Sequence, residues 1–388
     1  MKYFELSDIQ LSTRETAREF AVKKLLPGVI DRDRNLSFPK ELVDEMAALG
    51  LMGMMVDPVY NGGGMDTLSY ILALEEISKV DASAAVIMSV NNSLVCHGLQ
   101  NYGTEWQKQN YLSKLATGEY IGSFCLSEPE AGSDAANLKT ICENKGDHYL
   151  IHGTKNWITN GQRSDIHIVM ANGNPDLGHR GINTLIVEKK WPGVTIGVKE
   201  DKMGIRASDT TSIIYENVKV PKENLIEAEG HGFKYALNTL DGGRIGIAAQ
   251  ALGIATGAYE IALKYSKERI TFGKPIFDHQ IIQFKLADMA TEIEGARHLV
   301  YRAAWLKEQG KDYSAAAAMA KYVAAEMAMK QTTQAVQILG GYGYVREYHV
   351  ERMMRDAKIT QIYEGTSEIQ QLVLSREILK GNLYPAIL

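Results

Sequence analysis

The spacing of apolar residues changes its period twice along the chain, and this change constrains the fold more than any other feature. Residues 41–54 and 69–80 carry apolar side chains at helical intervals. From about 145 to 220 the pattern alternates and is rich in β-branched and aromatic residues, which is typical of antiparallel strands. Helical spacing returns at about residue 232 and persists. The sequence therefore predicts a helical segment, a β segment and a second helical segment.

Local signals refine the two helical segments. Ser12 or Thr13 is a candidate cap for a helix that runs towards Leu26, where Pro27 would end it. Residues 315–339 are rich in strong helix formers, and the short segment around Gly310 predicts that this helix pairs antiparallel with the preceding one. In that preceding helix the apolar residues step by three and four along one face: Leu286, Met289, Ile293, Ala296, Val300 and Ala303.

Composition narrows the class of protein. The chain has 388 residues, which corresponds to about two to three domains, and its 45% hydrophobic content is enough for sizeable cores. The net charge of −5 argues against nonspecific nucleic-acid binding, which needs a basic face. No run approaches a membrane-spanning length of uninterrupted apolar residues, so we expect no transmembrane helix.

The cysteines and the N-terminus bear on the compartment. Cys96, Cys125 and Cys142 lie far apart, with neither a disulfide framework nor the paired spacing of a metal site, so we expect a reduced, intracellular chain and no bound metal. The first residues lack an apolar core of signal-peptide length. We expect a bacterial cytoplasmic protein, or a mitochondrial matrix protein if this is a processed mature chain.

Two polar segments flank the start of the β region. Residues 125–140 (CLSEPEAGSDAANLKT) could offer hydroxyl and carboxylate groups to a ligand, although Pro, Gly, Ser and Asp are also ordinary turn formers. Residues 155–161 (KNWITNG) could place a flat Trp against a planar ring, or could simply be a strand that ends in an Asn-Gly turn. Taken alone, each segment favours the structural interpretation.

Glycines gather in two other segments. Gly242 and Gly243, at an expected helix start, allow close backbone approach, and the neighbouring Asp241 and Arg244 could form a local ion pair or face a ligand with equal plausibility. One glycine commonly ends a helix, but the three at positions 340, 341 and 343 indicate a backbone that something approaches closely, such as a phosphate on free N–H groups. The spacing does not match a doubly wound dinucleotide-binding fold.

The last segment, residues 362–370 (IYEGTSEIQ), contains a candidate base. Ser367 and Gln370 fit a capping box for the following helix. Glu364 lies between Tyr363 and Gly365, and a carboxylate there could project into an apolar space, where its pKa would rise as a general base requires. A solvated loop glutamate is the commoner outcome.

Together these motifs resemble the acyl-CoA dehydrogenase family over essentially the whole chain. One family signature is matched by Ser127-Glu128-Pro129-Glu130-Ala131-Gly132-Ser133-Asp134, with Asn137 in place of the usual small residue three positions later. The second spans residues 337–356 and is matched at Gln337, Gly340, Gly341, Gly343, Tyr344, Glu347, Arg352 and Asp356.

The resemblance implies a fold and its boundaries. We expect an α+β multidomain protein with an N-terminal α-helical domain (1–119), a middle antiparallel β-barrel-like domain with flavin contacts (120–229) and a C-terminal four-helix bundle (230–388). Family members bind FAD and oxidise the Cα–Cβ bond of an acyl-CoA thioester to a trans-2-enoyl-CoA. Glu364 matches the catalytic base, which removes an α-proton while the β-hydride passes to flavin N5. Some relatives carry the base on the helix near residue 241, but the matching position here is Gly243.

The resemblance also assigns binding roles. The expected FAD contacts are Phe124, Leu126, Ser127, Ser133, Trp157, Ile158, Thr159, Arg269, Phe272, Gln280, Gln337, Gly340, Gly341, Thr366 and Glu368. The expected acyl-CoA contacts are Ser133, Asp241, Arg244, Tyr363 and Gly365. In the family some of the groups that hold the FAD pyrophosphate and adenosine come from a neighbouring subunit, which implies a homo-oligomer, usually a tetramer. The expected electron acceptor is an electron-transfer flavoprotein.

Within the family the chain is most similar to the short-chain, or butyryl-CoA, branch. Glutaryl-CoA relatives place an Arg where this chain has Ala85 and Val86, which disfavours a dicarboxylic substrate. The alternatives are a branched-chain or cyclic acyl-CoA dehydrogenase, an acyl-CoA oxidase on the same fold and, least favoured, a non-catalytic binding or assembly protein.

Overall fold

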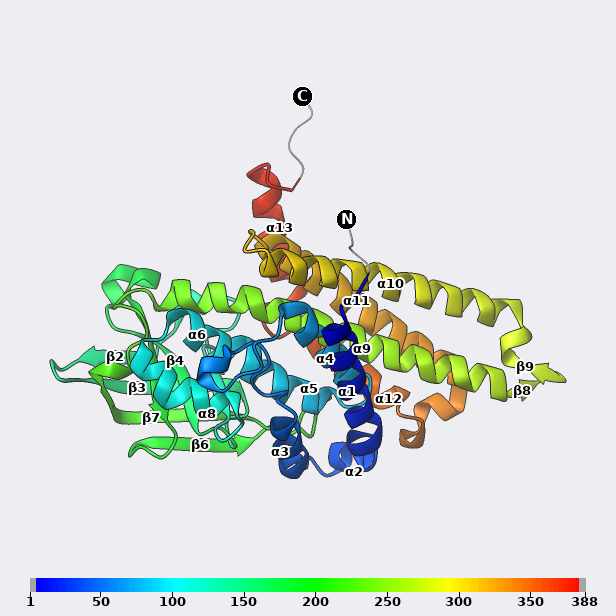
Figure 1. The fold of residues 1–388 in the computed structure, drawn as a ribbon, viewed down its shortest axis with the longest axis horizontal. Coiled ribbons are helices and arrows are strands. Elements are labelled where there is room, and N and C mark those ends of the chain that lie inside the picture. Colours follow the sequence, from blue (N-terminus) through cyan, green and yellow to red (C-terminus); the bar gives the residue numbers. More distant parts are fainter. Residues whose placement is uncertain (1–4, 384–388) are drawn as a thin grey trace.

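The computed structural model describes residues 5–383, in which a helical segment, a sheet and a second group of helices occur in that order. Helix α9 (Gly232–Glu268) runs through the long dimension of the molecule, with the sheet at one end and the short hairpin of β8 (Ile270–Thr271) and β9 (Lys274–Pro275) at the other (Figure 1). The two changes of period in the sequence therefore mark real changes of structure.

Within residues 5–119, the N-terminal segment contains helices and loops but no strand. Its helices are α1 (Asp8–Phe20), α2 (Val29–Arg34), α3 (Lys40–Ala48), α4 (Thr67–Ser78), α5 (Ala82–Ser89), α6 (His97–Tyr102), α7 (Glu105–Gln107) and α8 (Ser113–Ala116). The predicted cap at Ser12 or Thr13 is wrong, because Ser7 caps α1 by accepting from the Gln10 N–H while the Gln10 side chain accepts from the Ser7 N–H. This reciprocal pair satisfies two amides of the first turn that have no partner within the helix.

The middle segment forms a seven-stranded sheet with the order β1-β4-β2-β3-β7-β6, in which β5 also pairs with β4. The strands are β1 (Gly122–Cys125), β2 (Ile141–Asn144), β3 (His148–Thr159), β4 (Ile166–Asn172), β5 (Ile182–Glu188), β6 (Val194–Lys199) and β7 (Thr210–Pro221). The prediction of a purely antiparallel unit is wrong for two pairs, since β4 runs parallel to both β1 and β2. A separate apolar cluster that includes Tyr149, Val169 and Tyr215 gives the sheet a core of its own.

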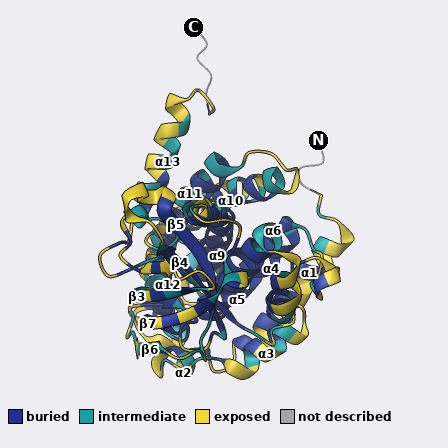
Figure 2. Cartoon of the chain, turned by 90° about the vertical axis from the view of Figure 1, so that its left-hand side faces the viewer, coloured by how far each residue is buried: buried dark blue, intermediate teal, exposed yellow. Residues whose placement is uncertain are grey.

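The C-terminal segment consists of α9, α10 (Gln280–Glu308), α11 (Ser314–Leu339), α12 (Val350–Thr360) and α13 (Ser367–Leu379). As predicted, α10 and α11 are two long helices joined by a short turn at Gly310. Gly242 and Gly243 are not at a helix start but inside α9. The capping prediction for α13 is also wrong, because Thr366 rather than Ser367 is the cap. Figure 2 shows α13 as a mostly exposed helix that projects from the body.

Helix α9 is the centre of the main core. By length and composition it could cross a membrane, but 83% of the apolar window lies buried inside the protein, as in the core helix of a soluble protein. Glycines allow it to lie very close to α4, since a Cβ at Gly253 would stand 2.4 Å from the Glu75 carbonyl oxygen. The close crossing helps to fix the position of α9, which carries Gly243, Asp241 and Arg244.

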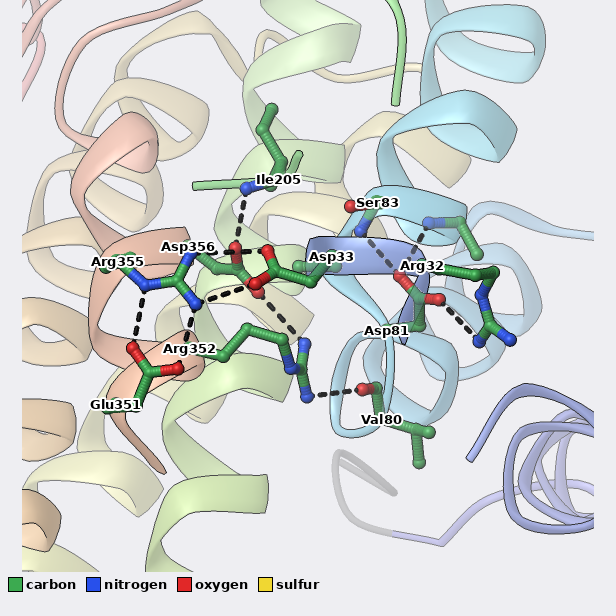
Figure 3. A network of polar contacts seen from close by, with 12 residues as sticks. Arg32, Asp33, Val80, Asp81, Ser83, Ile205, Glu351, Arg352, Arg355 and Asp356 are labelled. Carbon is green, nitrogen blue, oxygen red and sulfur yellow. Dashed lines mark hydrogen bonds and ion pairs between the residues drawn. The ribbon is translucent and has the colours of Figure 1, made fainter. Parts of the chain in front are cut away.

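A buried network of charges joins the three segments where they meet (Figure 3). Asp356 of α12 pairs with Arg352 at 3.0 Å and accepts from the Ile205 N–H of the β segment at 2.5 Å. Arg355 pairs with Asp33 of α2 at 2.8 Å, which ties the C-terminal helices to the N-terminal ones. Buried ion pairs need such additional hydrogen bonds to offset the loss of hydration. The network fixes the end of α12, from which the segment carrying Glu364 departs.

Candidate active site

Glu364 lies in the short connection between α12 and α13 and points its carboxylate at Gly243, in the first third of α9. Its backbone is left-handed, with φ 52°, and the Oε2 atom is buried without a hydrogen-bond partner. A Cβ at Gly243 would lie 2.2 Å from Oε2, so only glycine at that position leaves room for the carboxylate. The residue is partly exposed as a whole, while its reactive oxygen is shielded from water.

The surroundings of Glu364 adjust its proton affinity. Burial raises the pKa of Glu364 to about 7, and the positive charges of Lys321 and Arg244 oppose that rise. Near neutral pH the carboxylate therefore exists in comparable amounts of its charged and neutral forms, which is the condition under which a general base works best. The expected rise in the pKa of Glu364 by burial agrees with this geometry, although the two cations show that its surroundings are not wholly apolar.

The residues predicted to contact acyl-CoA lie on α9 and around Glu364, with one exception. Arg244 is buried and donates from Nη1 to Asp241, so the local ion pair exists, and burial raises the pKa of Asp241. Tyr363 donates its hydroxyl to Gln250 of α9. Ser133 is the exception, since it stands exposed on the loop that follows β1.

Two segments predicted to contact the flavin lie side by side at the ends of β1 and β3. The Ser123 hydroxyl donates to the Thr159 carbonyl at 2.9 Å, and the Asn156 N–H donates to the Ser127 carbonyl at 2.9 Å. A bulge in β3 leaves Trp157 with φ 61° and with 60% of its surface exposed. The flavin-contacting candidates on these segments are Phe124, Leu126, Ser127, Trp157, Ile158 and Thr159.

A buried ion pair fastens the loop after β1 to β3. The Lys155 ammonium donates to Glu128 at 2.7 Å and to the Leu126 carbonyl at 3.0 Å, and both side chains are almost fully buried. Glu128 also accepts from the backbone N–H groups of Lys139 and Thr140. The Glu of the first signature therefore shapes the loop from inside, which the spacing of that motif alone did not indicate.

A second group of predicted FAD contacts lies at the opposite end of the molecule, near the β8–β9 hairpin (Figure 1). Arg269, Gly340 and Gly341 line one open groove of about 600 Å³. Arg269 also stands over the Tyr342 ring, 5.4 Å from its centroid. Phe272 on the hairpin is 96% exposed. Gln280 begins α10 and Gln337 lies exposed in the last turn of α11.

A single chain therefore does not bring all predicted FAD contacts together. Trp157 is in the sheet, whereas Arg269 follows the far end of α9, a helix of 37 residues. Thr366 and Glu368 stand at the start of α13, where the Thr366 hydroxyl accepts from the Ile369 N–H as a helix cap. An exposed aromatic beside free polar groups at one end, and an Arg beside bare glycine backbone at the other, fit the ring and the pyrophosphate of FAD respectively.

Sequence reasoning missed Lys321 and Gln370, which contact the backbone beside Glu364. The only local signal was Gln370 itself, which the capping-box interpretation assigned to a different partner. Among residues 5–383, no group of His, Cys, Asp and Glu side chains could hold a metal ion.

Comparison with known proteins agrees with this arrangement segment by segment. Family models for the N-terminal, middle and C-terminal domains of acyl-CoA dehydrogenase match residues 7–119, 123–218 and 230–379. The chain belongs to the acyl-CoA dehydrogenase family. Its fold is the family's fold, with a curled sheet between two helical domains.

Named relatives match this acyl-CoA dehydrogenase along almost its whole length. The short-chain specific acyl-CoA dehydrogenase of Megasphaera elsdenii is 50% identical, over 97% of this chain and 100% of the relative. The structure of butyryl-CoA dehydrogenase from the same organism superposes with a TM-score of 0.96 at 50% identity and covers 97% of this chain and 99% of that one.

Two further relatives bear on partners and compartments. A chain from a structure described as the electron transferring flavoprotein of Acidaminococcus fermentans has a TM-score of 0.96 and 51% identity, over 97% of this chain and 99% of that one. The mitochondrial short-chain specific acyl-CoA dehydrogenase of Mus musculus is 48% identical, over 97% of this chain and 92% of the relative.

Proposed function

We propose that this acyl-CoA dehydrogenase uses FAD to oxidise a short-chain acyl-CoA, such as butyryl-CoA, to the trans-2-enoyl-CoA, with Glu364 as the base. The observation that carries the proposal is the Glu364 carboxylate, whose Oε2 is buried without a partner against Gly243. A carboxylate that is shielded from water and left without a hydrogen bond is free to accept a proton from carbon.

The reaction removes a proton from Cα and a hydride from Cβ of the thioester, and a double bond forms between the two carbons. Glu364 takes the α-proton on Oε2 and becomes a neutral acid. FAD, when bound, supplies the hydride acceptor for this oxidation. Burial, which raises the pKa of Glu364 to about 7, reduces the mismatch in proton affinity between the base and a weakly acidic α-carbon.

The fixed backbone around Glu364 supplies orientation. The enolate that develops at the thioester needs hydrogen bonds to its oxygen, and backbone N–H groups that are already in place can provide them without reorganisation. Arg244 adds positive charge at the same site and is held by Asp241. The chain thus places a base and positive charge around one small region of α9.

The predicted FAD contacts divide between two ends of the molecule, which supports a homo-oligomer. Trp157, Ile158 and Thr159 would hold the flavin ring beside the loop after β1, together with Phe124, Leu126, Ser127 and Ser133. Arg269, Gly340 and Gly341 of a neighbouring copy would hold the pyrophosphate and adenosine, with Phe272, Gln280 and Gln337, while Thr366 and Glu368 add contacts near Glu364. We propose a homotetramer with FAD at the contact between copies.

The substrate is a short, uncharged acyl chain in this proposal. The named relatives act on butyryl-CoA or are short-chain specific. Ala85 and Val86 of α5 are fully buried and offer no positive charge to a second carboxylate. A branched or cyclic chain is the nearest alternative, and a substrate panel separates it from a straight one.

Electrons pass from the reduced flavin to an electron-transfer flavoprotein in this proposal, as the likeness to the Acidaminococcus fermentans chain supports. Bacterial and mitochondrial relatives exist, and we propose the bacterial cytoplasm or the mitochondrial matrix as the compartment.

Anaerobic mixing of the purified, FAD-loaded protein with butyryl-CoA tests the proposal. The yellow flavin is expected to bleach, and to bleach more slowly with longer, branched or cyclic acyl-CoAs. Absence of reduction by every acyl-CoA in the panel would contradict the proposal and favour a binding role. Release of hydrogen peroxide during aerobic turnover, without need of an electron-transfer flavoprotein, would instead indicate an oxidase.

A further inference from the structure

We propose that Lys321 and Gln370 are positioning residues that hold the backbone of Glu364 and Gly365 from two sides, and that the Lys321 charge favours the reactive carboxylate. The inference rests on the proposed function, because it concerns the base of that reaction. Neither residue belongs to the two family signatures or to the predicted contacts of FAD and acyl-CoA.

Lys321 approaches the base from α11. Its side chain is fully buried, and its ammonium donates to the Gly365 carbonyl oxygen at 2.5 Å. Gln370 approaches from the first turns of α13, and it too is fully buried. Its amide nitrogen donates to the same Gly365 oxygen at 2.8 Å and to the Glu364 carbonyl oxygen at 3.3 Å. Two helices thus hold the two carbonyls that frame the base.

The turn needs such support because its backbone conformation is unusual. Glu364 has φ 52° and Gly365 has φ 90°, so two consecutive residues are left-handed. A residue with a side chain adopts this conformation only where its surroundings impose it. A Cβ at Gly365 would stand 2.6 Å from the Gln370 amide nitrogen, which shows how closely Gln370 packs on the turn. Release of the carbonyls would let Glu364 swing away from Gly243.

The charge of Lys321 has no obvious structural purpose in this position. Its hydrogen bond is made to a neutral carbonyl, and a buried ammonium without compensation is costly. Burial lowers the pKa of Lys321 to about 8, and Glu364 is the strongest of the charges that oppose this change. The interaction is reciprocal, since Lys321 is the largest charge favouring the ionised form of Glu364.

Other charged and titratable groups face the same region. Arg244 of α9 also favours the Glu364 carboxylate. Tyr70 of α4 is buried and the adjacent Tyr363 is partly buried, and burial of the two hydroxyls raises the pKa of both so that they remain neutral. Glu326 and Glu368 also favour the charged form of Lys321. Lys321 and Arg244 are therefore the two cations that oppose the effect of burial on the base.

The test compares two substitutions. Gln370→Met removes neutral hydrogen-bonding groups without a change of charge. Lys321→Met keeps the approximate length of the side chain but removes its charge and its hydrogen-bond donors. Lys330→Met on the same helix is the matched control, because Lys330 is exposed and pairs with Glu292 of α10. Each FAD-loaded protein is mixed anaerobically with butyryl-CoA over a range of pH. FAD content, affinity for a non-oxidisable acyl-CoA analogue and the crystal structure of each variant are determined alongside.

We expect flavin reduction to be about 10- to 100-fold slower in both Lys321→Met and Gln370→Met than in the parent, because misplacement of a reacting group slows a reaction by such factors. The pH at which the rate is half-maximal is expected to move upward only in Lys321→Met, while Lys330→Met matches the parent in rate and pH profile. The crystal structure of either slow variant is expected to show a changed φ at Glu364, with binding of the analogue retained.

An FAD-loaded Lys321→Met protein that matches the parent in rate and pH profile would overturn the inference. If Lys321→Met does not fold, Gln370→Met and Lys321→Arg test the inference instead. A parental rate of flavin reduction in Gln370→Met would contradict the inference. A rate in Lys321→Arg no higher than that in Gln370→Met would also contradict it. If the parent itself is not reduced by butyryl-CoA, the proposed function fails rather than this inference.

Discussion

Replacement of Glu364 by Gln is expected to stabilise the fold and to slow flavin reduction by acyl-CoA. In the folded protein burial raises the pKa of Glu364 from the ordinary 4.5 to about 7. A tenfold difference in proton affinity corresponds to about 1.4 kcal/mol. The ionised side chain therefore lowers the free energy of unfolding by up to about 3 kcal/mol, with some discount because the residue is partly exposed.

The sign of the effect depends on pH. Below pH 4.5 the carboxyl is neutral in both the folded and the unfolded chain, so burial imposes no ionisation cost. Between 4.5 and about 7 the unfolded chain loses its proton while the folded chain keeps it, so the stability of the parent falls as pH rises. Above about 7 the full cost is present. Gln resembles the neutral acid at every pH, so the advantage of the variant is absent in acid and greatest in base.

Urea unfolding of the FAD-loaded parent and of Glu364→Gln, at about pH 5 and about pH 8, measures the difference. The variant is expected to be more stable by about 2–3 kcal/mol at the higher pH and by less than about 1 kcal/mol at the lower one. Glu216→Gln is the matched control, because Glu216 is exposed on β7 and should show neither effect. Equal stability of parent and Glu364→Gln at the higher pH would refute the claim that ionisation of the buried carboxyl lowers the free energy of unfolding.

Four further outcomes follow from the geometry. Gly243→Ala places a Cβ 2.2 Å from the Glu364 Oε2 and should slow flavin reduction by about 100-fold. Gly295 is an exposed helical glycine with nothing within 4 Å of where a Cβ would stand, so Gly295→Ala should keep the rate and gain up to about 1 kcal/mol in urea unfolding. Equal rates of flavin reduction in the two variants would contradict the steric argument. Lys155→Met leaves the buried Glu128 without its cation, so it should cost about 3–5 kcal/mol of stability and weaken FAD retention. Urea unfolding measures the stability, and flavin absorbance after gel filtration measures the retained FAD. A variant that keeps its flavin and its stability would show that the pair does not shape the loop. Asp356→Asn weakens the ion pair and hydrogen bond at the junction of the three segments and should cost about 3 kcal/mol in the same unfolding assay. An unchanged unfolding curve would show that Asp356 does not stabilise this junction. The rate of flavin reduction by butyryl-CoA should rise with pH through about 7, because Glu364 must be ionised to accept a proton, and a rate independent of pH from about 5 to 8 would exclude such a base.

Much of the fold was predictable because it depends on local pattern. The changes of hydrophobic period located the helical and β segments, and the turn at Gly310 was correctly placed between α10 and α11. The parallel pairing of β1 with β4 was not predictable in this way, since parallel pairing joins strands that are distant in sequence. Both predicted helix caps were wrong: Ser12 or Thr13 was predicted five or six residues after the true cap Ser7, and Ser367 one residue after Thr366. Several nearby hydroxyl residues can serve as caps, so local sequence does not select among them.

The candidate site was predictable where a motif names a residue and not where packing decides its surroundings. Tyr363 and Gly365 made Glu364 a candidate base, but the family resemblance, and not these neighbours alone, favoured that role over a solvated loop glutamate. The contact between Glu364 and Gly243 joins segments about 120 residues apart, so no local pattern reveals it. Lys321 is equally hidden, because a lysine in a helix is ordinarily a solvated residue and only the tertiary structure shows that this one is buried. The assignment of the FAD and acyl-CoA contacts remains a prediction.

The most direct test of the account is the anaerobic reduction of the bound flavin by butyryl-CoA in the parent and in Glu364→Gln, followed by flavin absorbance. The parent is expected to bleach. Glu364→Gln is expected to retain FAD and bind acyl-CoA but to be reduced about 100- to 10,000-fold more slowly, as loss of a general base requires. Reduction of Glu364→Gln at the parental rate would show that another group removes the α-proton and would contradict the central claim.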